Sequence, residues 1–422
     1  MTTSARRRLD HVDAMRPIKQ AGVVSTHAII YFAPAAAAVG SGAAQLLLHV
    51  SREGFFFISA CMLAYAYADL RITNWAGLRR FYWRRFVAVG IPYLCWTLIY
   101  FCYTLPTSHY HGVRAALHGL RYMTETGYFQ LYFLLVIAQF YLVFPLLMIL
   151  LRWTRGHHGI VLAVTVAAQL AMSVLTDSHS LPGQMQAQNQ LDALSYLLYL
   201  VGGCIVAMHF EEVDAWVRGH TRPILAWTAV AAVGAEAIYL LGAYGVTSGL
   251  GPDYHAVIAG WSVYEPTVIP FNVGVIACGY LAGVALVRPD RSRVTRAVVR
   301  AGVDDAYGIY LSHVLFLTAL TWLGWGQLDS VMPWPLVCLL TVIVVVPCCV
   351  ALTALLARTP LAVPLTGRQR VRWRRPRAAA PVGAARTATP GTPAAPPETP
   401  AAGAETQDAG AETPAATSSP SR

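Results

Sequence analysis

Apolar runs of about 20 residues recur along most of the chain and are separated by short polar segments. A run of that length, rising about 1.5 Å per residue as an α-helix, crosses a hydrocarbon layer of roughly 30 Å. The pattern predicts an all-α, polytopic integral membrane bundle of about ten helices, with nine and eleven as alternatives. The predicted spans are 17–38, 52–70, 86–105, 128–151, 159–175, 191–209, 222–243, 265–287, 304–325 and 334–357.

Composition agrees with a membrane protein. Hydrophobic residues make up 56% of the chain and charged residues 12%, whereas a soluble domain carries roughly 25% charged residues. The net charge of +10 is spread over short loops rather than gathered in one patch, so it does not indicate a nucleic-acid partner. The eight cysteines all lie in apolar runs without a C-x-x-C pair, which favours small buried hydrophobes over redox or metal sites.

Basic residues alternate from one inter-span loop to the next. Arginines occur before span one and after spans two, four, six, eight and ten, whereas in the opposite loops only Arg114 and Arg121 lie clear of a span end. Because basic loops stay on the cytoplasmic side, both termini are predicted to be cytoplasmic in a multi-pass protein of the cell membrane.

Three regions follow from this arrangement. Residues 1–16 form a basic cytoplasmic N-terminus and 17–357 form the ten-helix membrane domain. Residues 358–422 begin with an arginine cluster and continue as an Ala/Pro/Thr-rich segment, a composition typical of a disordered tail.

The longest external loop before the seventh span, 106–127, has helical spacing of its own. Leu117 and Leu120 alternate with basic residues, which predicts a short amphipathic helix lying on the membrane. His109 and His111 have the spacing of a metal pair, but no third ligand lies nearby in sequence, so no metal site is expected.

The stretch from Asp13 to His27 combines charged and titratable residues with the start of a membrane span. Arg16 and His27 are eleven positions apart, so in a helix they share a face about 16 Å apart. Asp13 lies near the same face if the helix extends back past Pro17, or on an entry loop if Pro17 begins the helix. His27 then lies about halfway through the hydrocarbon layer, where polar groups are costly and usually functional. The alternative is a histidine that merely packs between helices.

His27 is suited to acid–base chemistry, and the arginines near the start of span three are suited to anion binding. A neutral imidazole at His27 can accept a proton from a hydroxyl, which is what transfer of an acyl group to an alcohol requires. Arg85 lies where a basic loop enters span three, seven residues before Pro92, and a guanidinium there either reaches out to the interface or binds an anion such as phosphate. Arg80 and Arg84 belong to the same group, for which an orientation signal is the competing interpretation.

Two other titratable residues lie within predicted spans. His313 lies in a late span with Tyr310 three residues before it on the same helical face. Glu53 is placed near the outer end of span two, where water would solvate it.

Five segments in order resemble the membrane acyltransferase 3 family over residues of about 10–357. They are Asp13-x-x-Arg16-x10-His27, F-F-F-I-S-A, R-R-F-V-A-V-G-I-P-Y, Y-F-Q-L-Y-F-L-L with F-Y-L-V-F-P-L-L, and A-Y-G-I-Y-L-S-H. Departures from the family pattern are Ala60 for a glycine, Tyr132 where a tryptophan is common, and Val87, Ala88 and Val89 where many members carry a second arginine.

The resemblance implies an integral membrane O-acyltransferase. It would move an acetyl or other short acyl group from acyl-CoA, as co-substrate, to a hydroxyl of a saccharide, a lipid-linked saccharide or a glycosylated metabolite, with no metal and no bound cofactor. The implied site residues are catalytic His27, Asp13 and Arg16, donor-binding Arg85, Arg84 and Arg80, and pocket residues Tyr132, Tyr310 and His313. His27 would act as general base or as a transient acyl carrier.

Two other functions compete with this one. The same spans could form an exporter of a polysaccharide or acylated product, although no internal repeat of the transporter kind is visible. A scaffold or inactive relative is the third interpretation, because the second arginine is missing.

Overall fold

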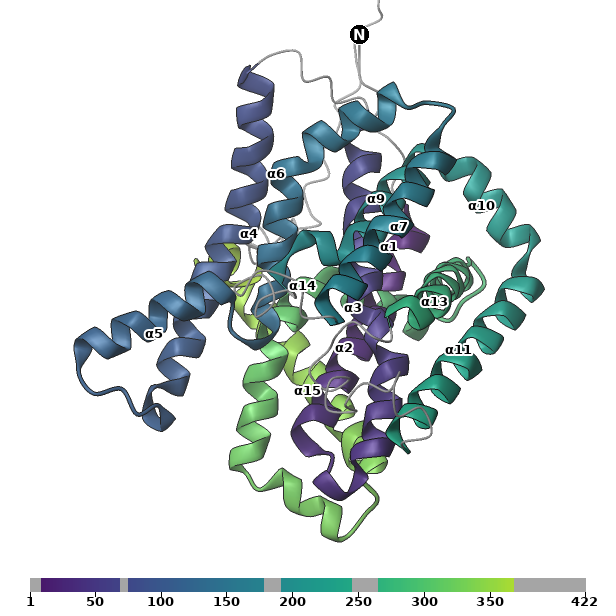
Figure 1. Cartoon of the computed structure of the whole chain (residues 1–422). Helices are drawn as coiled ribbons and strands as arrows, with labels where there is room; N and C mark the ends of the chain where they lie inside the picture. The colour runs from purple at the N-terminus through teal and green to yellow at the C-terminus, as the bar shows by residue number, and fades with distance from the viewer. Residues whose placement is uncertain (1–8, 69–74, 178–190, 245–264, 368–422) are drawn as a thin grey trace, which may run out of the picture. The chain divides into compact units, whose positions relative to one another are not determined.

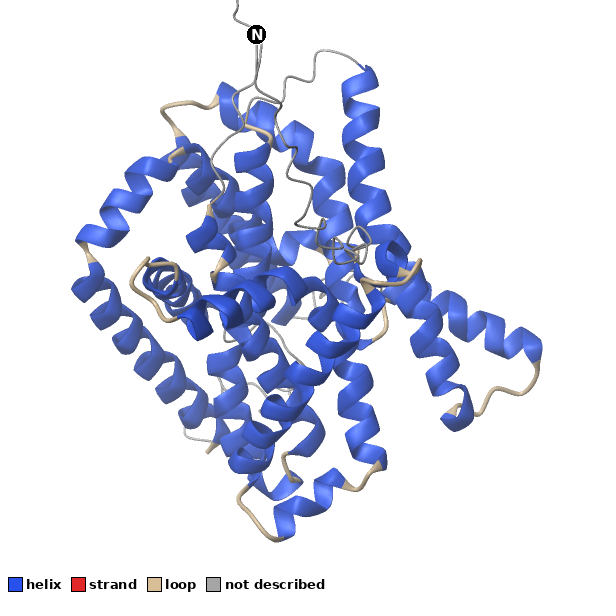
Figure 2. Cartoon of the chain, turned by 180° about the vertical axis from the view of Figure 1, so that it is seen from behind, coloured by secondary structure: helices blue, strands red, loops and turns tan. Residues whose placement is uncertain are grey.

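The computed structural model describes residues 9–68, 75–177, 191–244 and 265–367, in which every regular element is an α-helix or a 3₁₀ turn and no strand occurs (Figures 1 and 2). The all-α prediction is confirmed. The helices are α1 (Asp10–Asp13), α2 (Met15–Phe32), α3 (Ala38–Ala66), α4 (Trp75–Thr104), α5 (Val113–Thr126), α6 (Tyr132–Trp153), α7 (His158–Asp177), α9 (Leu197–Met208), α10 (Phe210–Gly219), α11 (Thr221–Ala243), α13 (Glu265–Leu286), α14 (Arg293–Trp322), α15 (Trp334–Leu356) and α16 (Ala362–Thr366).

Several of these helices are suited to crossing a membrane. Within the described residues, seven are long and apolar enough, and eight if α9 and α10, which meet at 98°, are counted with the preceding turn as one bent span. The protein is therefore a multi-pass membrane protein. Each of the ten predicted spans overlaps a helix, but α2 and α14 carry charged residues and are not among the seven. The count of ten and the cytoplasmic termini stay predictions.

The second predicted span begins too late. The helix α3 already begins at Ala38, although Ser41, Gln45 and Ser51 interrupt the apolar residues before 52. These three side chains are internal, each 5–7% exposed, and Glu53 is fully buried. Placing Glu53 at a solvated helix end was therefore wrong, because it lies in the body of α3 and pairs with Arg52.

Helix α2 lies at the centre of the packing. It contacts α3, α14 and α15, and Figure 1 shows it beside α3, both in purple, with the green α14 and α15 next to it. Gly22 of α2 faces Ser51 of α3, and Gly54 of α3 faces Lys19 of α2. These two facing pairs fix an antiparallel register between the helices.

Two short helices pack against α4 at the edge of the bundle. The amphipathic helix predicted in 106–127 is present as α5, with Leu117 60% exposed; its position on the membrane stays a prediction. The short α16 packs on α4, where the Trp96 indole Nε1 donates to the Leu365 carbonyl at 2.9 Å. Of the segment assigned to the tail, residues 358–367 are thus ordered against the bundle, and 368–422 lie outside the described residues.

The interface between α3 and α9 depends on a glycine. A Cβ on Gly203 would lie 2.6 Å from the Phe57 carbonyl oxygen, whereas a Cβ on its neighbour Gly202 would meet nothing within 4 Å. Backbone cannot move aside as a flexible side chain can, so only Gly203 is required for the close approach of the two helices.

We expect Gly203→Ala to lower the free energy of unfolding by about 1–3 kcal/mol, the usual cost of overpacking, and Gly202→Ala to leave it nearly unchanged. Thermal unfolding of the two purified variants in the same detergent checks this difference. Equal melting temperatures for the two variants would contradict the packing described for α3 and α9.

Candidate active site

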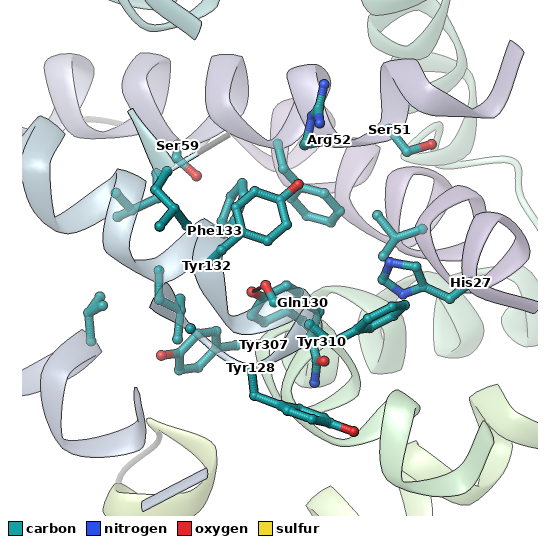
Figure 3. A pocket seen from close by; sticks show the side chains of 18 of the residues that line it. His27, Ser51, Arg52, Ser59, Tyr128, Gln130, Tyr132, Phe133, Tyr307 and Tyr310 are labelled. Carbon is teal, nitrogen blue, oxygen red and sulfur yellow. Dashed lines mark hydrogen bonds between the residues drawn. The ribbon is translucent and has the colours of Figure 1, made fainter. Parts of the chain in front are cut away.

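A cavity of about 1090 Å³ lies between α2, α3, α4, α5, α6 and α14. Figure 3 looks into it, with His27 of α2 on one side and Tyr132, Phe133, Tyr307 and Tyr310 across from it. The wall formed by α2 is one helical face, because at about 100° per residue its residues lie within roughly 120° of one another. These residues are Arg16, Gln20, Val23, Thr26, His27 and Ile30.

The imidazole of His27 is held by a second imidazole. His27 Nδ1 lies 2.7 Å from His313 Nε2, and the two rings lie edge to edge, with centroids 4.9 Å apart and an interplanar angle of 2°. His313 Nδ1 lies 2.7 Å from the Tyr310 carbonyl oxygen and 3.1 Å from that of Ile309. His313 is fully buried in α14 and stands behind His27 rather than in the cavity wall.

These contacts determine where the protons lie when both rings are neutral. A carbonyl oxygen only accepts, so His313 Nδ1 must donate its proton to Tyr310 and His313 Nε2 must be an acceptor. His27 Nδ1 therefore donates to His313 Nε2. The remaining nitrogen, His27 Nε2, carries a lone pair and has no hydrogen-bond partner among the described residues.

An aromatic residue in an unusual backbone conformation presses on His27. The Phe129 ring lies 4.9 Å from the His27 ring, and Phe129 has φ +41°. A bulky side chain in the left-handed region is strained, and such strain is found mainly where function requires it. The conformation keeps the Phe129 ring against the imidazole at the point where the chain enters α6.

A hydrogen-bond network fixes α14 relative to that turn. The Tyr310 hydroxyl donates to the Gln130 carbonyl oxygen. The Gln130 amide nitrogen donates to the Tyr100 hydroxyl at 2.9 Å, and Tyr100 in turn donates to the Leu311 carbonyl at 2.8 Å. The network therefore couples the position of His313 to that of Phe129.

Two arginines mark another part of the cavity wall. Arg16 Nη2 lies 3.3 Å from the Asp13 carboxylate, and Arg85 stacks over the rings of Tyr67 at 4.9 Å and Tyr141 at 6.0 Å. Both guanidinium groups interact electrostatically with the Tyr141 hydroxyl, so they lie on the same part of the wall. Arg85 Nε is buried without a hydrogen-bond partner among the described residues. Together they form a cationic surface suited to phosphate.

The structure separates the predicted site residues into three groups. Arg16, His27, Arg85, Tyr132 and Tyr310 all line the cavity. Asp13 and His313 lie behind the wall and hold Arg16 and His27, respectively. Arg84 and Arg80 are exposed and outside the wall, so their part in donor binding stays a prediction.

Asp13 and His27 are not partners in this arrangement. Asp13 ends α1, and α2 begins at Met15, which makes Pro17 the third residue of that helix. The proline is tolerated there because its missing N–H belongs to the first turn. Asp13 holds Arg16 instead, and the hydrogen-bonding group beside His27 is His313.

A cation in α3 was missed by the sequence prediction. Arg52 lines the cavity, stacks over the Tyr196 ring at 4.9 Å and pairs with Glu53, with Nε 2.9 Å and Nη2 2.5 Å from the same oxygen. The available signal was the spacing of seven between Gln45, Arg52 and Ser59, all of which line the cavity. That spacing places three polar residues on one helical face.

No cluster of three or more His, Cys, Asp or Glu side chains with the geometry of a metal site occurs in the part of the chain that the structure describes. His109 and His111 are both exposed, in the segment before α5. The expectation of no metal site remains untested.

Comparison with known proteins identifies the family. Residues 10–353, from α1 into α15, match the acyltransferase domain that defines the acyltransferase 3 family. No significant match was found among curated proteins or solved structures. The matched range includes α2, α3, α4, α5 and α6, and it includes α14 with both residues of the histidine pair. The chain therefore belongs to the membrane acyltransferase 3 family and is a multi-pass enzyme of the acyltransferase type.

Proposed function

We propose that the protein transfers an acetyl or other short acyl group from acyl-CoA to a hydroxyl of a saccharide, a lipid-linked saccharide or a glycosylated metabolite. The observation that carries this proposal is the His27 ring. Its Nδ1 is held by His313, its Nε2 has no protein partner, and it shares one cavity with Arg16 and Arg85.

His27 Nε2 is the general base in this proposal. It takes the proton of the acceptor hydroxyl as the oxygen attacks the thioester carbonyl, because an alcohol is a weak nucleophile until that proton leaves. The C–S bond then breaks, and the protonated Nε2 returns the proton to the CoA sulfur. The products are the O-acyl ester and free CoA. In the alternative route the same nitrogen carries the acyl group transiently, which ping-pong kinetics would reveal.

The donor lies along α2 in this proposal. The diphosphate binds at Arg16 and Arg85, and the thioester reaches His27, about 16 Å further along the helix. The acceptor enters past α5 and the turn after it, which supply Tyr122, Met123, Thr126 and Tyr128 to the cavity wall. The two substrates thereby approach the imidazole from different elements.

We expect His27→Ala to reduce acyl transfer at least 10²-fold, and up to 10⁴-fold for a general base alone. Mass spectrometry of acylated products from cells expressing each variant measures the loss. His220→Ala, which removes an exposed histidine between α10 and α11, is the matched control and should retain transfer. Full acylation by a membrane-inserted His27→Ala protein would remove the basis of the proposal.

His313 acts through His27, so its replacement should affect turnover more than donor binding. We expect His313→Leu to lower kcat by about 100-fold, because the His27 ring loses the acceptor that fixes its tautomer and orientation. His313→Gln retains an acceptor and should recover part of that loss. The donor KM should stay within about twofold in both variants. A kcat that is the same for Leu and Gln would show that hydrogen bonding to His27 is not the role of His313.

We expect the neighbouring residues Arg84 and Arg85 to contribute differently to CoA affinity. Arg85→Gln should weaken CoA binding at least tenfold, because a partly buried guanidinium that binds a phosphate contributes a charge-assisted hydrogen bond. Arg84→Gln, one residue away but exposed and outside the cavity wall, should change affinity little. Calorimetric titration of the two purified variants with CoA measures both. Equal losses would mean that the phosphates bind on the exposed face, as the sequence prediction for Arg84 requires.

A further inference from the structure

The side chain of Gln20 is a buried amide without a protein partner. It is 2% exposed and lines the cavity from α2, yet neither its Oε1 nor its Nε2 has a hydrogen-bond partner among the described residues. Buried amides in folded proteins are almost always satisfied. An unsatisfied amide in a cavity wall therefore indicates that its partner is a molecule that enters the cavity.

The place of Gln20 along α2 narrows the choice of ligand. It lies one turn after Arg16 and two turns before His27 on the same face, which corresponds to rises of about 6 Å and 10.5 Å. A molecule extending from the arginines to the imidazole passes the Gln20 amide about a third of the way along.

On the opposite wall, the polar residue closest in level to Gln20 is Arg52 of α3, and its guanidinium already has protein partners. The facing pairs Gly22 with Ser51 and Gly54 with Lys19 place Arg52 level with the residue after Gln20. The Arg52 guanidinium is held by Glu53 and by the Tyr196 ring. Gln20 thus has a donor and an acceptor without a protein partner among the described residues, in the cavity wall between the phosphate-binding and reacting ends.

We propose that the Gln20 amide hydrogen-bonds the pantetheine arm of the acyl donor, at the amide nearer the diphosphate. This inference rests on the proposed function, in which CoA is the carrier. The carbonyl carbon of that amide is four bonds from the ester oxygen that joins pantetheine to the diphosphate, and the sulfur is twelve bonds from it. At about 3.5 Å per three bonds of an extended chain, the amide lies roughly 5 Å and the sulfur roughly 14 Å from that oxygen. They match the levels of Gln20 and His27 relative to Arg16.

Amide pairing is the chemistry that makes this contact selective. A glutamine amide offers both an N–H donor and a carbonyl acceptor, and a pantetheine amide offers the complementary pair. An acyl chain or a lipid tail offers neither. The contact would therefore distinguish a CoA-linked donor from free nucleotide and from membrane lipid.

The test compares two ligands that differ by the arm. The purified full-length protein in lipid nanodiscs is titrated with CoA and with 3′-phosphoadenosine 5′-diphosphate, which retains all three phosphates of CoA but lacks pantetheine. Gln20→Met preserves side-chain length and removes the hydrogen bonds, so we expect its Kd for CoA to rise about tenfold and its Kd for the nucleotide to stay unchanged. The control is Gln327→Met, which removes an exposed glutamine of the 3₁₀ turn Trp325–Ser330, outside the cavity wall. It should leave both affinities unchanged.

The possible outcomes separate the two proposals. No CoA binding by the wild-type protein would overturn the proposed function itself. Wild-type binding with an unchanged Gln20→Met protein would overturn only the role of Gln20. An equal loss of affinity for both ligands would also overturn that role, because Gln20 would then act by positioning Arg16. A rise in the acceptor KM alone would overturn it as well, because Gln20 would then contact the acceptor.

A second measurement compares two ligands on the same protein sample, so a partly unfolded variant does not change the ratio of the two affinities. A CoA analogue in which that amide is replaced by an ester lacks the N–H that Gln20 Oε1 would accept. We expect the wild-type protein to bind it several-fold more weakly than CoA, and the Gln20→Met protein to bind the two equally, as coupled partners require. The same preference in both proteins would contradict the contact.

Discussion

An imidazole inside an apolar bundle must find its hydrogen-bond partner within the protein, because lipid offers none. His27 finds that partner in His313, 286 positions away in the sequence. Because His313 is itself bound to backbone carbonyls of α14, the contact determines more than the orientation of a ring. It determines which nitrogen of His27 faces the substrates, and so it links the packing of α2 on α14 to the chemistry.

The same constraint explains the other polar residues around the cavity. Arg16 is paired with Asp13, and Arg52 with Glu53 and an aromatic ring. The Arg52–Glu53 pair is buried, and a buried ion pair is seldom more stable than apolar packing of the same volume. The presence of these paired cations in α2 and α3 is better explained by the need to hold them at defined places in a cavity wall. Gln20 differs from them, because its amide remains unpaired among the described residues until a ligand arrives.

Sequence patterns predicted the parts that depend on local spacing. Apolar runs located the helices, the amphipathic period located α5, and the interval between Arg16 and His27 placed both on one face of α2. The pattern misplaced the start of α3, because buried polar residues such as Gln45 and Ser51 resemble a loop when only hydropathy is considered. The sequence pattern could not predict the hydrogen-bond partner of His27, for a related reason. The spacing of Tyr310 and His313 makes them neighbours on one helix, but a contact between distant helices leaves no periodic signal in one sequence.

The most direct measurement is an experimental structure of the protein with an acyl-CoA analogue in which methylene replaces the thioester sulfur. We predict that the ketone carbon lies within about 5 Å of His27 Nε2, leaving room for one hydroxyl oxygen between them. We also predict that the diphosphate lies against Arg16 and Arg85, with the His27–His313 hydrogen bond intact. A nucleotide bound elsewhere, or a His27 ring turned toward lipid, would contradict the central claim that this histidine pair activates the acceptor.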